Sequence, residues 1–254
     1  MTSMLWWRVA GLTRYIRELW VHAPAARGVA LLCVAVYLMQ GICRQVACVA
    51  GYSFEYLLLH CFGLCPALFA TGFIWQLGTY LFLHLNVWHL LCNALGLLLL
   101  GGGVEGEIGA KRFLRLFFLG GVAGGLAWVL WDLAVMALAG GPAWLPTGLA
   151  ALGRLAASQR VVTAEGSALC IGASGGLFAL IGAIAALFPR RRLLLFLVWP
   201  VRARRFAVVL GGLSVVFLIY GLGNVAHLTH LVGGVAGYLY GRRLAAEGWG
   251  DGAA

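Results

Sequence analysis

The sequence predicts an all-α membrane protein: a bundle of six transmembrane helices with a partly embedded outer loop between spans 1 and 2. Hydrophobic residues make up 63% of the 254 residues and charged residues 10%, whereas a soluble domain has roughly 45–50% apolar and ~25% charged residues. The apolar residues form runs long enough to cross a bilayer, which takes about 17–25 residues. Short clusters of Lys and Arg separate these runs, as membrane topology requires.

The chain is expected to form one membrane domain with two flanking segments. Six apolar runs are predicted to span the bilayer, at residues 28–50, 87–103, 113–139, 168–188, 206–222 and 225–241. Residues 1–27 mix Arg and Trp without a clean apolar run, so we expect a cytoplasmic amphipathic helix at the interface. Residues 242–254 form a cytoplasmic tail, residues 193–200 are too short to span, and a tight turn at Gly223-Asn224 joins the last two spans.

The distribution of basic residues indicates the orientation. With six spans, 15 of the 18 Lys and Arg residues fall on one side and only Arg44, Arg154 and Arg160 on the other. The basic side of a membrane protein is cytoplasmic, so both termini are expected inside. The net charge of +10 therefore reflects topology and contact with the lipid bilayer, and nucleic acid is not expected as a partner.

Residues 56–75 are also apolar, but a span there would worsen the charge split to 12 against 6. The segment contains His60, Gly63, Pro66 and Gly72, which favour a broken structure. Non-helical backbone at membrane depth is tolerated only where it packs against protein. We therefore expect a partly embedded loop on the outer face.

Polar side chains inside the spans are costly in lipid and mark candidate functional sites. Span 2 contains His89 and Asn93, span 4 contains Ser174, and span 6 contains His230. All three spans are expected to run inward from the outer face. A helical rise of ~1.5 Å per residue puts Ser174, Asn93 and His230 about 8–9 Å below that face. His89 lies about 3 Å below it by the same rise. A hydroxyl, an imidazole and an amide are thus expected near one level.

Glycines accompany two of these residues. Ser174 lies in the run Gly172-Ala173-Ser174-Gly175-Gly176, which exposes backbone around a nucleophile but also allows close helix packing. A lone serine in a span is more often a small packing residue. His230 is followed on its helix face by Gly233, Gly234, Gly237 and Gly241. This stripe allows span 6 to press against a neighbour such as span 4, and His227 is expected to support His230.

Several roles are open for the remaining polar residues. His89 and Asn93 share a helix face, where they could hold an oxyanion or tie span 2 to the outer loop, as is expected of His84. Metal binding by the histidines is a further possibility, but no carboxylate or thiolate lies at ligand spacing, so neither a metal nor a cofactor is expected. Asp132 and Glu165 have no sequence link to the histidines, which favours a Ser-His dyad over a triad.

The seven cysteines are dispersed along the chain. Cys61 and Cys65 have a C-x3-C spacing without a second pair, which is weak evidence for a metal site. Buried free thiols are expected, with an outer-face disulfide as the alternative.

At these residues the sequence resembles the rhomboid family of intramembrane serine proteases, over roughly residues 28–241. Several motifs occur in the family's order: Trp75-Gln76-Leu77, Phe82-Leu83-His84, the H-x4-H-x3-N spacing of His84, His89 and Asn93, the E-x3-G turn of Glu105 to Gly109, the G-x-S-G of Gly172 to Gly175, and the A-H-x2-H-x2-G run of Ala226 to Gly233. Two positions depart from the family pattern. Gln76 stands where many members have Arg, and Phe178 stands where Tyr is common.

The resemblance implies a role for each of these residues. Ser174 would be the nucleophile and His230 its base, with His89, Asn93 and the Ser174 amide as oxyanion donors. Phe178 would fix the His230 ring by packing. The other expected supporting residues are Trp75, His84, Glu105, Gly172, Gly175, His227, Gly233 and Gly237.

The resemblance also implies the substrate and the setting. A serine endopeptidase of this kind would cut single-span membrane proteins within or next to their transmembrane helix, near the outer face of a bacterial inner membrane. One alternative is an inactive rhomboid-like protein that binds transmembrane helices and guides their traffic. Another is a transporter or channel, but the sequence shows neither inverted repeats nor charges spread through the membrane depth.

Overall fold

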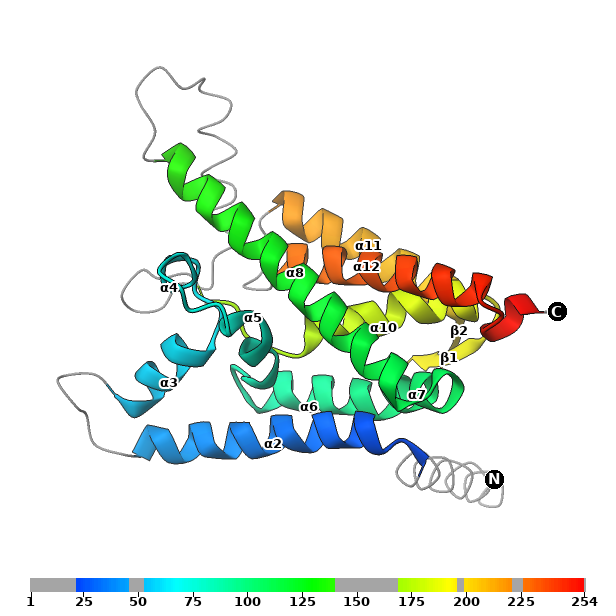
Figure 1. The fold of residues 1–254 in the computed structure, drawn as a ribbon, viewed down its shortest axis with the longest axis horizontal. Coiled ribbons are helices and arrows are strands. Elements are labelled where there is room, and N and C mark those ends of the chain that lie inside the picture. The colour runs from blue at the N-terminus through cyan, green and yellow to red at the C-terminus, as the bar shows by residue number, and fades with distance from the viewer. Residues whose placement is uncertain (1–21, 46–52, 140–168, 196–198, 221–225, 254) are drawn as a thin grey trace.

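The computed structural model describes residues 22–45, 53–139, 169–195, 199–220 and 226–253. Most of the expected N-terminal amphipathic helix, the turn at Gly223-Asn224, and Arg154, Arg160 and Glu165 of the outer loop lie outside these residues. Within them the chain is mostly helical, as Figure 1 shows.

Four helical stretches of the described chain are long and apolar enough to cross a membrane. They are α2 (Pro24–Gln45), the stretch Val87–Ile108, Ala110–Ala134 of α8 (Ala110–Ala139), and α11 (Ala203–Tyr220). The second stretch consists of α6 (Val87–Gly96), a π-helical turn (Leu97–Gly101) and α7 (Gly102–Ile108). Helices α10 (Ser174–Leu187) and α12 (His227–Ala246) occupy the runs expected for spans 4 and 6. A helical membrane fold is thus supported, and the six-span count stays a prediction.

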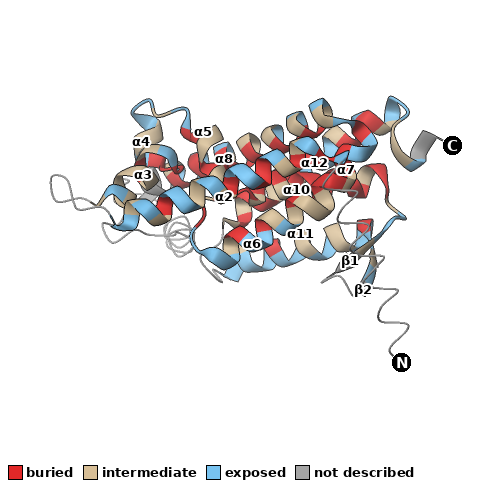
Figure 2. Cartoon of the chain, turned by 90° about the horizontal axis from the view of Figure 1, so that it is seen from below, coloured by how far each residue is buried: buried red, intermediate tan, exposed pale blue. Residues whose placement is uncertain are grey.

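Helix α10 forms the centre of the bundle. Ten of its 14 residues are buried, and α8 and α12 pack against it. Figure 2 shows buried positions gathered along α10 and α12. By contrast, α2 and α11 expose large aliphatic side chains such as Leu38, Ile42 and Val208. In a bilayer such side chains face lipid, whose tails are as apolar as they are.

The glycine stripe of α12 lies directly against α10. A Cβ atom at Gly233 would lie 2.5 Å from the carbonyl oxygen of Gly175, and one at Gly237 would lie 2.0 Å from that of Ala179. No side chain fits in so little space, so the two backbones meet only because these positions are glycine. The prediction that span 6 presses on span 4 is confirmed. The contact also places the first turns of the two helices beside each other.

Between α2 and α6 the chain forms short helices instead of a span. They are α3 (Phe54–Phe62), α4 (Pro66–Ala70), α5 (Gln76–Thr79) and a 3-10 turn (Tyr80–Phe82), and they gather at one end of the molecule (Figure 1). Pro66 opens α4, and Gly72 has a φ of 110°, a conformation that favours glycine. The broken structure expected for residues 56–75 is confirmed, and its depth in the membrane stays a prediction.

The opposite end of the molecule carries a small sheet. Strand β1 (Arg192–Leu195) pairs antiparallel with β2 (Trp199–Arg202), and the start of α2 and the C-terminal end lie at this same end (Figure 1). Residues 193–195 and 199–200, which lie in a run expected to be too short to span, belong to these two strands. The described fold is thus mostly helical, as expected, with one short hairpin that was not expected. Strands of four residues are too short to give a periodic signal that separates them from other apolar runs.

Glu105 fastens the start of α2 at that end. Its carboxylate accepts hydrogen bonds from the backbone nitrogens of Ala25 at 3.0 Å and Ala26 at 2.7 Å, and the residue is buried. The first N–H groups of a helix have no partner within the helix, and a negative charge is favourable there. Glu105 thus caps a helix that lies about 80 residues earlier in the chain.

Candidate active site

Ser174 and His230 meet where two helices begin. Ser174 is the first residue of α10, and His230 lies in the first turn of α12. The Nε2 atom of His230 is 2.7 Å from Oγ of Ser174, which is a hydrogen-bond distance for a hydroxyl that donates to an imidazole. A serine with a base in this position has the geometry of an activated nucleophile.

The segment before Ser174 is extended and is held by residues from the segment of short helices between α2 and α6. Cys170 exchanges two backbone hydrogen bonds with Leu64, of 2.9 and 3.0 Å, and the nitrogen of Gly172 donates to the carbonyl of Tyr80 at 2.9 Å. The depth expected for Ser174 assumed a helix from residue 168, whereas α10 begins at Ser174, and the depth itself stays a prediction. Backbone pairing with the outer loop, together with a φ of 124° at Gly172, keeps these residues out of the helix.

His89 and Asn93 reach the same place from α6. A Cβ atom at Gly172 would lie 2.6 Å from Nε2 of His89 and 3.7 Å from Nδ2 of Asn93, so both nitrogens face the backbone just before Ser174. Nδ2 of Asn93 is buried and has no hydrogen-bond partner among the described residues. A buried donor without a partner is costly, and an oxyanion formed at Ser174 would supply the missing acceptor.

The hydrogen bonds of His89 indicate which ring nitrogen carries its proton. The backbone nitrogen of Leu85 lies 3.4 Å from Nδ1 of His89 and donates to it. An imidazole nitrogen that accepts a hydrogen bond leaves the proton on the other nitrogen. Nε2 of His89 is therefore a donor directed toward Gly172, beside the amide of Asn93.

Aromatic rings hold His230 from two sides. The ring of Phe178, one turn after Ser174 on α10, stacks on the ring of His230 with the centroids 4.2 Å apart. The ring of His227 packs edge-on at 6.2 Å and in turn contacts Phe217 of α11 at 5.3 Å. The base is thus fixed by packing from its own helix and from the helix that carries the serine.

Trp75 and Gln76 fasten the short helices to one another. Nε1 of Trp75 donates to the carbonyl of Cys61 at 2.8 Å. Gln76 is fully buried; it donates through Nε2 to the carbonyl of His60 at 2.6 Å and accepts from the nitrogen of Cys65 at 3.0 Å. An amide can donate and accept at once, so the single glutamine ties both segments together.

His84 lies in the loop just before α6 and is fully buried. Its ring packs edge-on against that of His89, with the centroids 5.0 Å apart. Burial, and to a lesser extent the neighbouring His89, lower the pKa of His84 to about 4. The ring is therefore neutral at neutral pH. His84 joins the outer loop to the candidate site, as the sequence suggested.

These side chains border a cavity of about 510 Å³, a size typical of ligand sites. Ser174, His230, His89, Asn86 and Asn93 supply its polar wall. Most of the remaining wall is apolar and includes Leu85, Trp88, Trp128, Leu169, Ile171 and Leu177. A cavity of this kind can take an apolar peptide segment while presenting a few polar groups to its backbone.

Two residues at the site were not singled out from the sequence. The hydroxyl of Tyr80 donates to the carbonyl of Gly121 at 2.7 Å, and both Tyr80 and Thr229 lie close to Gly175, where a Cβ would be 3.1 and 2.9 Å from their side-chain atoms. Thr229 lies between His227 and His230 in the sequence, and this position could have marked it as a residue of the site. Nothing in the sequence around Tyr80 indicates a place in the site, because only the tertiary fold brings this residue to α10.

The six cysteines within the described residues are free thiols. Cys33, Cys65 and Cys170 are buried, as expected, whereas Cys92 is exposed at the edge of the cavity. No disulfide forms among these six cysteines, so the alternative of an outer-face disulfide is not realised within the described residues. In the described parts of the chain, no three His, Cys, Asp or Glu side chains are grouped so that they could hold a metal ion.

Fold and site together define a helical membrane protein with a partly buried serine–histidine pair between two packed helices. The model of the Rhomboid domain matches residues 71–247, which is more than half of the chain, and the chain belongs to the rhomboid family. The resemblance seen in the sequence is thereby confirmed.

Two characterised relatives share this similarity. The chain is 26% identical over 171 residues to RHOMBOID-like protein 1 of Arabidopsis thaliana, a match that covers 66% of this chain and 34% of that protein. It is 31% identical over 166 residues to the mitochondrial Rhomboid protein 1 of Saccharomyces cerevisiae, covering 63% of this chain and 39% of the relative. The matched region is thus less than half the length of either relative.

Proposed function

We propose that this protein is an intramembrane serine endopeptidase that uses a Ser174–His230 dyad. Its substrates would be single-span membrane proteins, cut within or next to the transmembrane helix near the outer face. The observation that carries this proposal is the 2.7 Å contact between Oγ of Ser174 and Nε2 of His230. The donors of His89 and Asn93 beside Gly172 support it, because they lie where negative charge would develop.

The reaction has two stages. Oγ of Ser174 bonds to the carbonyl carbon of the peptide while Nε2 of His230 takes the hydroxyl proton. The charge on the carbonyl oxygen is held by the Ser174 amide, Nε2–H of His89 and Nδ2 of Asn93. The carbon–nitrogen bond then breaks as His230 gives its proton to the leaving amine. In the second stage water attacks the acyl carbon and His230 takes a proton from it. The bond between the acyl carbon and Oγ then breaks as His230 returns that proton to Ser174, and the peptide leaves with a new carboxyl group.

A transmembrane helix hides its carbonyls in its own hydrogen bonds. A substrate must therefore unwind over a few residues before Ser174 can reach a carbonyl carbon. The short helices α3 to α5 and the polar ends of α6, α10 and α12 lie toward one end of the molecule (Figure 1), and we assign that end to the outer face. Both termini are then cytoplasmic. The bacterial inner membrane is the proposed location, although both named relatives come from eukaryotes.

The test is the reaction of the detergent-purified protein with a fluorophosphonate probe, which labels activated serines. We expect wild type to be labelled and Ser174→Ala and His230→Ala not to be. Ser214→Ala is the matched control, because Ser214 is also buried in a helix but lies on α11; this variant should label like wild type. Folded wild-type protein without labelling would overturn the proposal and favour the inactive helix-binding alternative.

A further inference from the structure

Gln40 is a fully buried polar residue in α2, a helix that otherwise faces lipid near this position. Its neighbours Leu38 and Ile42 are 63% and 66% exposed. A polar side chain on such a helix is costly unless it finds a partner inside the protein. The partner of Gln40 therefore indicates what this side chain contributes.

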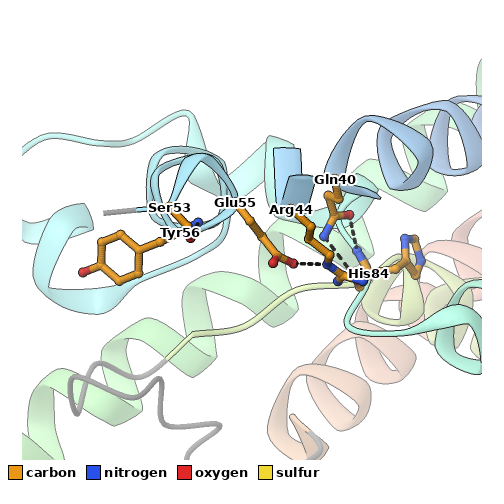
Figure 3. Close-up of polar contacts among 6 residues, drawn as sticks. All are labelled: Gln40, Arg44, Ser53, Glu55, Tyr56 and His84. Atoms are coloured by element: carbon orange, nitrogen blue, oxygen red, sulfur yellow. Dashed lines mark hydrogen bonds and ion pairs between the residues drawn. The ribbon is translucent and has the colours of Figure 1, made fainter. Parts of the chain in front are cut away.

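The side-chain amide of Gln40 makes two hydrogen bonds with the backbone of His84, as Figure 3 shows. Nε2 of Gln40 donates to the carbonyl oxygen of His84 at 3.0 Å, and Oε1 accepts from the backbone nitrogen of His84 at 3.1 Å. The pair resembles one rung of a sheet, and it fixes the backbone at residue 84 in position and in orientation. It joins α2 to the segment that leads directly into α6.

The next residue along the chain makes the contact that orients His89. The nitrogen of Leu85 donates to Nδ1 of His89 at 3.4 Å, and the ring of His84 packs against the edge of the His89 ring. A shift of the backbone at His84 would move both contacts together. The Nε2 proton of His89 would then lose its fixed direction toward Gly172.

We propose that Gln40 is a positioning residue for the oxyanion donor His89, acting through the backbone of His84 and Leu85. This inference rests on the proposed function. It adds a residue that precedes the matched rhomboid region, which begins at residue 71. Gln40 touches neither the substrate nor the reacting atoms. Its effect is to keep one hydrogen-bond donor in place.

A second polar contact on α2 supplies a matched control. Arg44 lies one turn after Gln40 and pairs with Glu55 of α3 at 2.5 Å (Figure 3). This ion pair also joins α2 to the outer end, but it does not contact the His84–Leu85 segment. Arg44→Ala therefore loosens the same helix without disturbing the link to His89.

The experiment measures the inactivation of detergent-purified protein by a fluorophosphonate–rhodamine probe, as the maximal rate kinact and the half-saturating concentration KI. Gln40→Met removes both hydrogen bonds and keeps the side-chain length. We expect kinact to fall about fivefold to tenfold with KI nearly unchanged, which is less than the ~10²–10³-fold cost of losing an oxyanion donor outright. Arg44→Ala should stay within about twofold of wild type.

A double-mutant cycle separates positioning from general destabilisation. In a His89→Ala background, Gln40→Met should change kinact by less than about twofold, because the group that it positions is already absent. Should Gln40→Met fail to fold, Gln40→Glu, which keeps the acceptor and loses the donor when ionised, takes its place. Equal losses in both backgrounds, or a kinact equal to that of wild type, would overturn the inference and leave the proposed function intact. Wild type without Ser174-dependent labelling would overturn both.

Discussion

The ring of Phe178 lies parallel to the ring of His230, with their planes inclined by 2° and their centroids 4.2 Å apart. Phe178 follows Ser174 by one turn on α10, so the helix that carries Ser174 also carries the ring on which His230 stacks. The flat ring limits the rotation of the imidazole and keeps Nε2 directed at Oγ of Ser174. A tyrosine hydroxyl is not needed for this contact.

Replacing Phe178 tests the stacking. Phe178→Leu should slow fluorophosphonate labelling about twofold to tenfold, because an aromatic pair is worth about 0.5–1.5 kcal/mol beyond its burial. Phe178→Tyr keeps the ring and should label within about twofold of wild type. The measurement is the rate of labelling at saturating probe. A leucine variant as fast as wild type would show that other contacts fix His230.

Gly172 tests the oxyanion geometry. A methyl group at this position would lie 2.6 Å from the His89 ring, at a φ of 124°, so Gly172→Ala should reduce labelling by at least about 100-fold, the cost of losing an oxyanion donor. Gly212→Ala is the control, because nothing lies within 4 Å of its Cβ position in α11. That variant should be as active as wild type and slightly more stable. Normal labelling of Gly172→Ala would refute the assignment.

The contact between α10 and α12 can be tested with two glycines of the same stripe. The Cβ of Gly237→Ala would meet the carbonyl oxygen of Ala179 at 2.0 Å, whereas that of Gly234→Ala has 3.7 Å to that of Phe178. Overpacking costs roughly 1–3 kcal/mol, so Gly237→Ala should unfold at a clearly lower temperature in detergent. Gly234→Ala should unfold near the wild-type midpoint. Equal midpoints would contradict the close contact.

Two glutamates near the hairpin end should differ in their effect on stability. Glu105→Ala leaves the part-buried N–H of Ala25 and the buried N–H of Ala26 without acceptors. It should lower the free energy of unfolding by about 1–3 kcal/mol. Glu107 forms an ion pair with Arg191 in which both side chains are about 40% exposed, and such pairs contribute about 0–1 kcal/mol. Glu107→Ala is thus the control. Thermal unfolding in detergent compares the two variants.

His84 makes the stability of the protein depend on pH. Burial lowers its pKa from 6.5 to about 4 in the folded chain, so the unfolded chain binds more protons between these values. Stability is then complete above about pH 6.5 and falls as the pH drops toward 4. His84→Gln keeps the backbone contacts with Gln40 and should show a smaller decrease in unfolding midpoint between pH 7.5 and 5. An unchanged decrease would assign the effect to other groups.

The sequence was most informative where lipid makes polar residues rare. Ser174, Asn93 and His230 stood out against apolar runs, and the glycine stripe of α12 predicted its contact with α10. Contacts between distant segments could not be predicted in this way. Hydropathy alone predicts a helix that begins at residue 168. Instead Cys170 pairs with Leu64, and α10 begins only at Ser174. The partners of Glu105 and Gln40 likewise depend on the tertiary arrangement, because nothing local marks them.

Helix α2 lies before the matched rhomboid region, yet buried side chains hold it at both ends, Glu105 at its first turn and Gln40 near its last. A fragment that began at residue 71 would retain Ser174, His230, His89 and Asn93. It would nevertheless leave the buried carboxylate of Glu105 and the buried backbone of His84 without the partners that α2 supplies. The boundary of sequence similarity and the boundary of the autonomous folding unit therefore differ by a whole helix. A fragment that keeps these contacts has to begin ahead of Pro24.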